Sequence, residues 1–122
     1  MRYIIDTLGC KVNQYETQAM ETLLAERGHT PAGEGETADA VIVNSCAVTA
    51  ESGRKSRQAL RRLAEGHPGA VRAVCGCWSQ VEPDSAAALG ADIVWGSGDR
   101  HGFIDALERA VDSLKYSVAL AK

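Results

Sequence analysis

The chain has 122 residues, of which 45% are hydrophobic and 24% charged, and this composition fits one globular domain with its own core. Its net charge of −3 excludes a surface that is positive overall. No apolar run approaches a membrane span, and the first residues lead into a strand-like segment rather than a signal peptide. We therefore expect the four cysteines to be thiols in the reducing cytoplasm, where cysteine serves metals or catalysis more often than disulfides.

Strand-like and helix-like segments alternate along the chain. Residues 3–5, 39–44, 71–75 and 91–95 predict strands, and residues 14–27, 49–65, 83–89 and 102–114 predict helices. Residues 29–38 contain Pro31, Gly33 and Gly35, and they predict a loop. The residues expected to face the core are Tyr15, Ala19, Met20, Leu23 and Leu24 in the first helix, Ser56, Ala59, Leu60, Leu63 and Ala64 in the second, and Phe103, Leu107, Val111 and Leu114 in the last.

This alternation predicts a three-layer α/β fold of the flavodoxin/Rossmann-like type. It would contain an open parallel sheet of about four strands, with helices on both faces and right-handed crossovers. We expect the strand order 2-1-3-4, which puts the first strand in the middle of the sheet. Residues 1–114 are expected to form one domain, and residues 115–122 a connector that is poorly ordered.

Three cysteines follow predicted strands directly. Cys10, Cys46 and Cys77 each stand where a strand should stop, and the carboxyl ends of parallel strands share the edge where ligands bind. Soft thiolates select zinc, copper(I) or iron–sulfur clusters. A structural zinc site usually takes four ligands in paired knuckles, which this sequence lacks. Three dispersed cysteines point instead to a [4Fe–4S] cluster with one iron left open.

Other interpretations of these cysteines remain open. Each cysteine can be a small buried hydrophobe, although burial alone does not explain three equivalent positions at one edge. A flavodoxin-like cofactor-binding module would need a phosphate-cradling run after the first strand, where the chain offers only Leu8-Gly9-Cys10-Lys11. A zinc-stabilised interaction domain is the third alternative. Metal analysis and an absorption spectrum distinguish cluster, flavin and zinc.

Several further residues have two interpretations. Cys75 ends a buried strand and is expected in the core, with a fourth ligand or reserve thiol as the alternative. Asn13 and Asn44 stand near the ligand cysteines and are candidate cofactor-binding residues that donate hydrogen bonds toward cluster sulfur; ordinary turn and cap chemistry is the alternative. The basic run Arg54, Lys55, Arg57, Arg61 and Arg62 is either a contact for RNA phosphates or a solvated helix face. His29, His67 and His101 are expected at the surface.

Four segments of the chain resemble the radical-SAM methylthiotransferase family, in the family's order. The segments are Thr7-Leu8-Gly9-Cys10-Lys11-Val12-Asn13-Gln14-Tyr15-Glu16-Thr17, then Asn44-Ser45-Cys46-Ala47-Val48-Thr49 with Lys55-Ser56-Arg57-Gln58, then Gly76-Cys77-Trp78-Ser79-Gln80, and Asp92-Ile93-Val94-Trp95-Gly96 with Asp99-Arg100. The resemblance covers residues 2–114. It implies the amino-terminal domain of such an enzyme, in which Cys10, Cys46 and Cys77 hold an auxiliary [4Fe–4S] cluster.

The resemblance also implies an activity. The first motif looks most like the branch that methylthiolates threonylcarbamoyl-adenosine beside the tRNA anticodon; sister branches act on isopentenyl-adenosine or on an aspartate of a ribosomal protein. In the family, a radical domain binds S-adenosylmethionine and a second [4Fe–4S] cluster through a C-x₃-C-x₂-C motif, which these 122 residues do not contain. We therefore expect a monomeric fragment that needs a sulfur donor and tRNA as partners, presents sulfur on its open iron and does not turn over alone.

Overall fold

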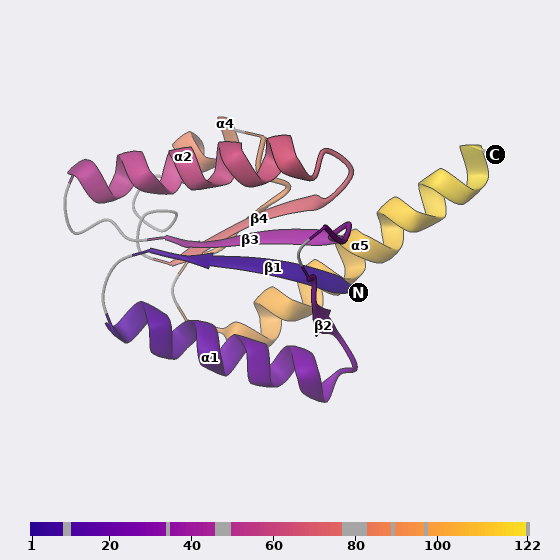
Figure 1. The fold of residues 1–122 in the computed structure, drawn as a ribbon, viewed down its shortest axis with the longest axis horizontal. Coiled ribbons are helices and arrows are strands. Elements are labelled where there is room, and N and C mark those ends of the chain that lie inside the picture. Colours follow the sequence, from indigo (N-terminus) through magenta and orange to yellow (C-terminus); the bar gives the residue numbers. More distant parts are fainter. Residues whose placement is uncertain are drawn as a thin grey trace.

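The computed structural model describes residues 1–8, 11–33, 35–45, 50–76, 83–88, 90–96 and 98–121, and it confirms the predicted fold class (Figure 1). The elements in chain order are β1 (Arg2–Thr7), α1 (Lys11–Glu26), β2 (Thr30–Pro31), β3 (Ala40–Ser45), α2 (Ala50–Gly66), β4 (Val71–Gly76), α4 (Pro83–Ala88), β5 (Ile93–Val94) and α5 (Arg100–Ala121). Strands and helices alternate except that β2 is followed directly by β3, and every strand pair is parallel.

The sheet has five strands in the order β2-β1-β3-β4-β5, with β1 inside the sheet as expected. The neighbours of β1 in the sheet differ from the predicted ones. The segment predicted as the second strand is β3, which lies between β1 and β4. The outer side of β1 pairs instead with β2, inside the segment predicted as a loop.

Backbone hydrogen bonds hold β2 to β1. The Thr30 amide donates to the Met1 carbonyl at 3.1 Å, and the Ala32 amide donates to the Tyr3 carbonyl at 2.8 Å. Pro31 between them lacks an N–H, which an edge strand tolerates. β2 is therefore a short strand at the edge of the sheet.

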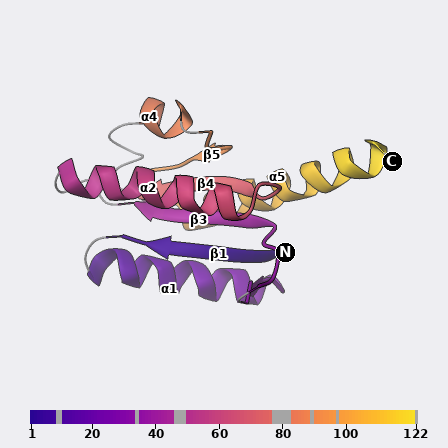
Figure 2. The same cartoon turned by 45° about the horizontal axis from the view of Figure 1, so that its top comes forward.

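Helices cover both faces of the sheet. α2 lies on one side and α1 on the other, and α5 packs beside α1 and against β4 (Figures 1 and 2). Residues of β3 therefore pack on both faces of the sheet. Ala40 and Ile42 belong to the core beneath α1 and α5, whereas Val43 packs with α2. All residues of β3 are buried, as expected for a parallel strand covered on both faces.

Most of the predicted core positions are confirmed among the described side chains. Ser56 and Leu60 of α2, and Phe103 and Leu107 of α5, are fully buried. The exception is Tyr15, which the sequence pattern placed on the inner face of the first helix and which is 66% exposed. Tyr15 lies in the second turn of α1, outside the row of inward positions to which its buried residues Asn13, Thr17, Met20 and Leu24 belong.

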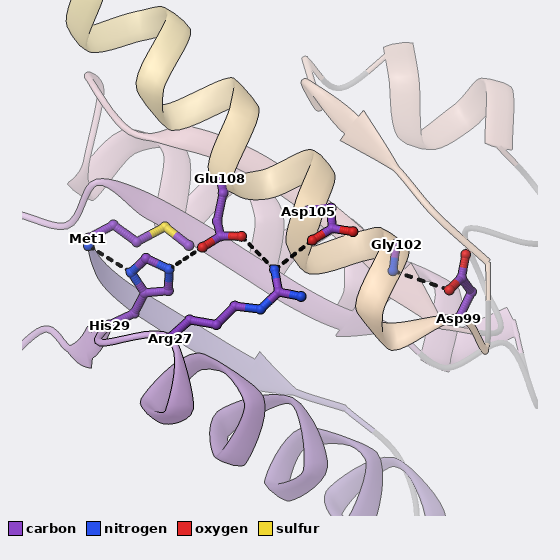
Figure 3. A network of polar contacts seen from close by, with 7 residues as sticks. All are labelled: Met1, Arg27, His29, Asp99, Gly102, Asp105 and Glu108. Atoms are coloured by element: carbon purple, nitrogen blue, oxygen red, sulfur yellow. Dashed lines mark hydrogen bonds and ion pairs between the residues drawn. The ribbon is translucent and has the colours of Figure 1, made fainter.

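α5 extends further at both ends than its predicted range. It begins at Arg100, where the Asp99 carboxylate accepts a hydrogen bond from the Gly102 amide at 3.1 Å and so caps the helix (Figure 3). It continues through Ala121, so residues 115–121 are helical, and their role as a connector stays a prediction. Of the described helices, none is long and apolar enough to cross a membrane.

A polar network joins the end of α1 to α5 (Figure 3). Arg27 contacts Asp105 at 2.6 Å and Glu108 at 2.5 Å. The His29 Nε2–H donates to Glu108 at 2.7 Å, while the terminal ammonium group of Met1 donates to Nδ1 at 2.9 Å. His29 is thus half-buried and partnered, not a surface residue as the sequence suggested, because its partner lies 79 residues away in the chain.

Candidate functional site

The predicted ligands Cys10, Cys46 and Cys77 lie outside the described residues, so their role stays a prediction. The strand ends that lead toward them are described as far as Leu8, Ser45 and Gly76, and they lie together at the carboxyl edge of the sheet. The Leu8 amide donates to the Asn44 carbonyl at 3.0 Å, and Ser45 pairs with Gly76 in the register of β3 and β4. Because β1, β3 and β4 are consecutive neighbours, the three strand ends that precede the predicted ligands meet at one place.

Asn13 joins two of these strand ends. Its Nδ2 group donates to the Leu8 carbonyl at 2.6 Å and to the Ser45 carbonyl at 3.0 Å, and the residue is only 7% exposed. Asn13 reaches both because it lies in the first turn of α1, shortly after the end of β1. A single buried amide therefore fixes the ends of β1 and β3 relative to the start of α1.

Asn44 completes the connection from the strand side. Its Nδ2 group donates to the Asn13 carbonyl at 2.9 Å and to the Thr17 hydroxyl at 3.1 Å, and Thr17 shares a 2.6 Å hydrogen bond with Thr7. An amide group has two donor hydrogens, and both are occupied in Asn13 and in Asn44. The arrangement supports a positioning role for the two asparagines, and their predicted donation toward cluster sulfur stays a prediction.

Gly76 allows β3 and β4 to approach closely just before Cys77. Its φ of +96° is a conformation that side chains rarely adopt, and a Cβ atom added there would lie 2.5 Å from the Ser45 carbonyl oxygen and 2.8 Å from Asn44 Oδ1. The Ser45 hydroxyl donates to the Cys75 carbonyl at 2.6 Å across the same pair of strands. The sequence contains this glycine in a motif, but only the structure shows why no larger residue fits.

Cys75 is a buried thiol, as predicted. It is 6% exposed and packs in the core beneath α1 and α5. Burial, and to a smaller extent the carboxylate of Glu16, raises the pKa of the Cys75 thiol to about 12. Without a metal, the Cys75 thiol therefore stays protonated at neutral pH, as expected for a core residue.

A cavity of about 40 Å³ opens at this edge between α1 and α5. Its lining includes Asn13, Glu16, Asn44, Cys75, Trp95 and Arg100. Glu16 and Arg100 form an ion pair of 2.6 Å beside it, a connection between the two helices that sequence reasoning missed because the partners are 84 residues apart. The cavity has room for water-sized groups.

The described residues alone do not form a metal site. Among them, there is no group of three or more His, Cys, Asp or Glu side chains that could hold a metal ion. A metal centre at this edge consequently requires ligands from outside the described residues, and Cys10, Cys46 and Cys77 are the predicted ones. Their thiol chemistry and the convergence of the preceding strand ends are compatible with one shared site.

The basic run lies on the outer side of α2. Arg54, Lys55, Arg61 and Arg62 are exposed and Arg57 is half-buried. Arg62 pairs with Asp6 of β1. Both predicted interpretations of this run remain compatible with its position.

These features define a class: a parallel α/β fold whose candidate site lies where three cysteine-bearing connections leave one edge of the sheet. Comparison with known sequences specifies it further. The chain belongs to the family described as "Uncharacterized protein family UPF0004", whose sequence model matches residues 2–96.

Named relatives confirm the resemblance to the amino-terminal domain of methylthiotransferases. The chain is 44% identical over 103 residues to the threonylcarbamoyladenosine tRNA methylthiotransferase MtaB of Bacillus subtilis, covering 81% of this chain and 23% of the relative. Identity to MtaB of Thermotoga maritima is 37% over 101 residues, covering 83% and 23%. The tRNA-2-methylthio-N(6)-dimethylallyladenosine synthase of Corynebacterium efficiens is 33% identical over 123 residues, covering 97% and 24%. The chain thus spans about a quarter of the length of these relatives.

Proposed function

We propose that residues 1–114 form the domain of a tRNA methylthiotransferase that holds an auxiliary [4Fe–4S] cluster through Cys10, Cys46 and Cys77. The observation that carries the proposal is the convergence of Leu8, Ser45 and Gly76, which precede the three cysteines, at one edge of the sheet. Three thiolates leave one iron of such a cluster without a protein ligand. When bound, the cluster supplies an iron that accepts and presents sulfur.

The chain's own residues supply the rigidity of this site. Asn13 and Asn44 hold the ends of β1 and β3 through hydrogen bonds that are buried, and Gly76 lets β4 lie against β3. A ligand set drawn from three separate strands binds well only if those strands keep a fixed spacing. We infer that cluster binding needs little rearrangement of these strand ends.

The proposed substrate is the threonylcarbamoyl-adenosine beside the tRNA anticodon. Two relatives named for that substrate, at 44% and 37% identity, are more similar to this chain than the dimethylallyladenosine synthase at 33%, and they support this branch, although MtaB of Aquifex aeolicus is only 28% identical. S-adenosylmethionine and a second cluster would be held by sequence outside these 122 residues, whose four cysteines do not form the C-x₃-C-x₂-C motif. A tRNA substrate and oxygen-sensitive thiols fit the predicted cytoplasmic location.

Anaerobic reconstitution of the chain with iron and sulfide tests the cluster. We expect about four irons and four sulfides per chain. Replacing Cys10, Cys46 or Cys77 by alanine should remove most of this iron, whereas Cys75→Ala, which changes a buried core thiol, should keep it. Loss of the iron in Cys75→Ala would contradict the ligand assignment. A colourless protein that contains zinc would instead support the zinc-stabilised interaction domain, and a yellow protein would support the flavodoxin-like module.

A further inference from the structure

Positive charge is concentrated on α2. This helix carries five basic and two acidic residues, a net charge of +3, so the rest of a chain whose total is −3 carries −6. All five basic residues lie within the nine positions from 54 to 62. An acidic protein with one basic helix has a directional surface potential, which steers a polyanion to that helix.

Three arginines form a stripe along one side of α2, where Arg54 and Arg61 are exposed and Arg57 is half-buried. Arg54, Arg57 and Arg61 are spaced by three and four residues, which places them on neighbouring turns. The stripe is about 10 Å long at the helical rise of about 1.5 Å per residue, long enough for two or three successive phosphates of a nucleic-acid strand. Within the part of the chain that the structure describes, Arg57 and Arg61 form no hydrogen bond or ion pair through their side chains, in contrast to Arg62, which pairs with Asp6.

The stripe starts at the edge that carries the candidate site. α2 begins at Ala50, five residues after Ser45, and its first turns lie at the end of the sheet toward which β1 and β3 point (Figures 1 and 2). Arg54 and Arg57 are in these turns, and Arg61 lies one turn farther from the edge. A strand of nucleic acid along the stripe would therefore lead toward the carboxyl edge of the sheet.

We propose that the outer face of α2, through Arg57 and Arg61, contacts the phosphate backbone of the tRNA substrate. This inference rests on the proposed function for the identity of the nucleic acid, and it adds the surface that binds it. Phosphate contacts position a nucleic acid without reading its sequence, so the face contributes affinity and orientation rather than choice of the modified base.

The experiment compares charge variants of the full-length gene product. Arg57→Glu/Arg61→Glu should weaken tRNA binding at about 0.1 M salt by roughly tenfold or more, and should reduce the slope of log affinity against log salt by about 0.7–0.9 for each phosphate that is no longer neutralised. Arg57→Lys/Arg61→Lys should bind nearly as the parent does, because a phosphate contact needs the charge. Fluorescence anisotropy with labelled tRNA over a salt series measures both quantities.

Arg109→Glu is the matched control. Arg109 is exposed on α5, beside α1 rather than α2, and its reversal changes the net charge by the same amount as Arg61→Glu. We expect Arg109→Glu to leave the affinity and the salt slope unchanged, whereas Arg61→Glu alone should lower both. Circular dichroism and iron content, measured on every variant, show whether the fold and the cluster are retained.

Three outcomes would overturn the inference: tRNA affinity that is unchanged in the double reversal, an equal loss in Arg109→Glu, or a parent that binds no tRNA. The first would show that the basic face of α2 is only a solvated helix face. The second would show that tRNA binding responds to the net charge of the protein rather than to this face. If the parent binds iron but no tRNA, the inference fails while the cluster proposal stands. If the parent binds tRNA through this face but takes up no iron, the inference holds and the cluster proposal fails.

Discussion

The side-chain amide of Asn13 donates both of its hydrogens to backbone carbonyls of two different strand ends. A sequence motif identifies such a residue as notable but does not say which atoms it contacts, and donation to cluster sulfur was an equally reasonable interpretation. The geometry makes a different role testable. A residue that fixes the spacing of the strand ends should matter for the stability of the metal-free chain as well as for cluster binding.

We predict that Asn13→Ala lowers the free energy of unfolding of the metal-free chain by about 1–3 kcal/mol, because the Leu8 and Ser45 carbonyls lose a buried donor. Urea denaturation measures this change. Gln14→Ala, at the exposed neighbouring position of α1, is the control and should change the free energy by no more than about 0.5 kcal/mol. Equal stability of Asn13→Ala and the parent would show that Asn13 does not position the strand ends.

At the scale of elements, the sequence predicted what local pattern determines. The hydrophobic spacing located every α-helix that the described residues contain. It also located the segments that form β1, β3, β4 and β5. β2 was missed because Thr30 and Pro31 lie in a segment with the loop residues Gly33 and Gly35 and form a strand only by pairing with β1. The place of β3 in the sheet depends on that pairing, since β2 occupies the side of β1 that the prediction gave to β3.

The network between α1 and α5 has a pH dependence whose sign follows from its carboxylates. The hydrogen bond from His29 and the contact with Arg27 hold the pKa of Glu108 below its ordinary value of 4.5, and Arg27 likewise lowers the pKa of Asp105. A carboxyl whose pKa is lower in the folded state contributes stability above its ordinary pKa. That contribution is lost as the pH falls through the lowered value.

Glu108→Gln should therefore be less stable than the parent at pH 7, by about 1 kcal/mol or less because Glu108 is partly exposed. The difference should shrink as the pH falls below 4.5, where the parent's carboxyl becomes protonated as well. Denaturation midpoints between about pH 3 and pH 7, a range that roughly brackets the carboxyl titration, check this. A difference that is constant over this range would mean that the contact depends on shape rather than charge.

For the molecule as a whole, the convergence of the strand ends was more predictable than the arrangement around it, and the cysteine site at that edge stays a prediction. Any parallel sheet collects the carboxyl ends of its strands at one edge, so the positions of Cys10, Cys46 and Cys77 after strands were sufficient to predict a shared site there. The ion pair of Glu16 with Arg100 was not predictable, because it depends on how α1 and α5 pack rather than on local sequence. The same holds for His29 and Glu108.

A site shared by three strand ends exists only in the folded chain, so binding there must be coupled to the stability of the whole sheet. We predict that the reconstituted chain unfolds at a temperature roughly 10 °C or more above that of the metal-free chain, when the cluster is held far above its dissociation constant. Anaerobic thermal melts followed by circular dichroism measure the shift. The variant with Cys10, Cys46 and Cys77 all replaced by alanine, carried through the same reconstitution, should show no shift. A parent that binds four irons without any rise in its melting temperature would place the iron on residues that do not need the fold, and the edge formed by Leu8, Ser45 and Gly76 would not be the binding site.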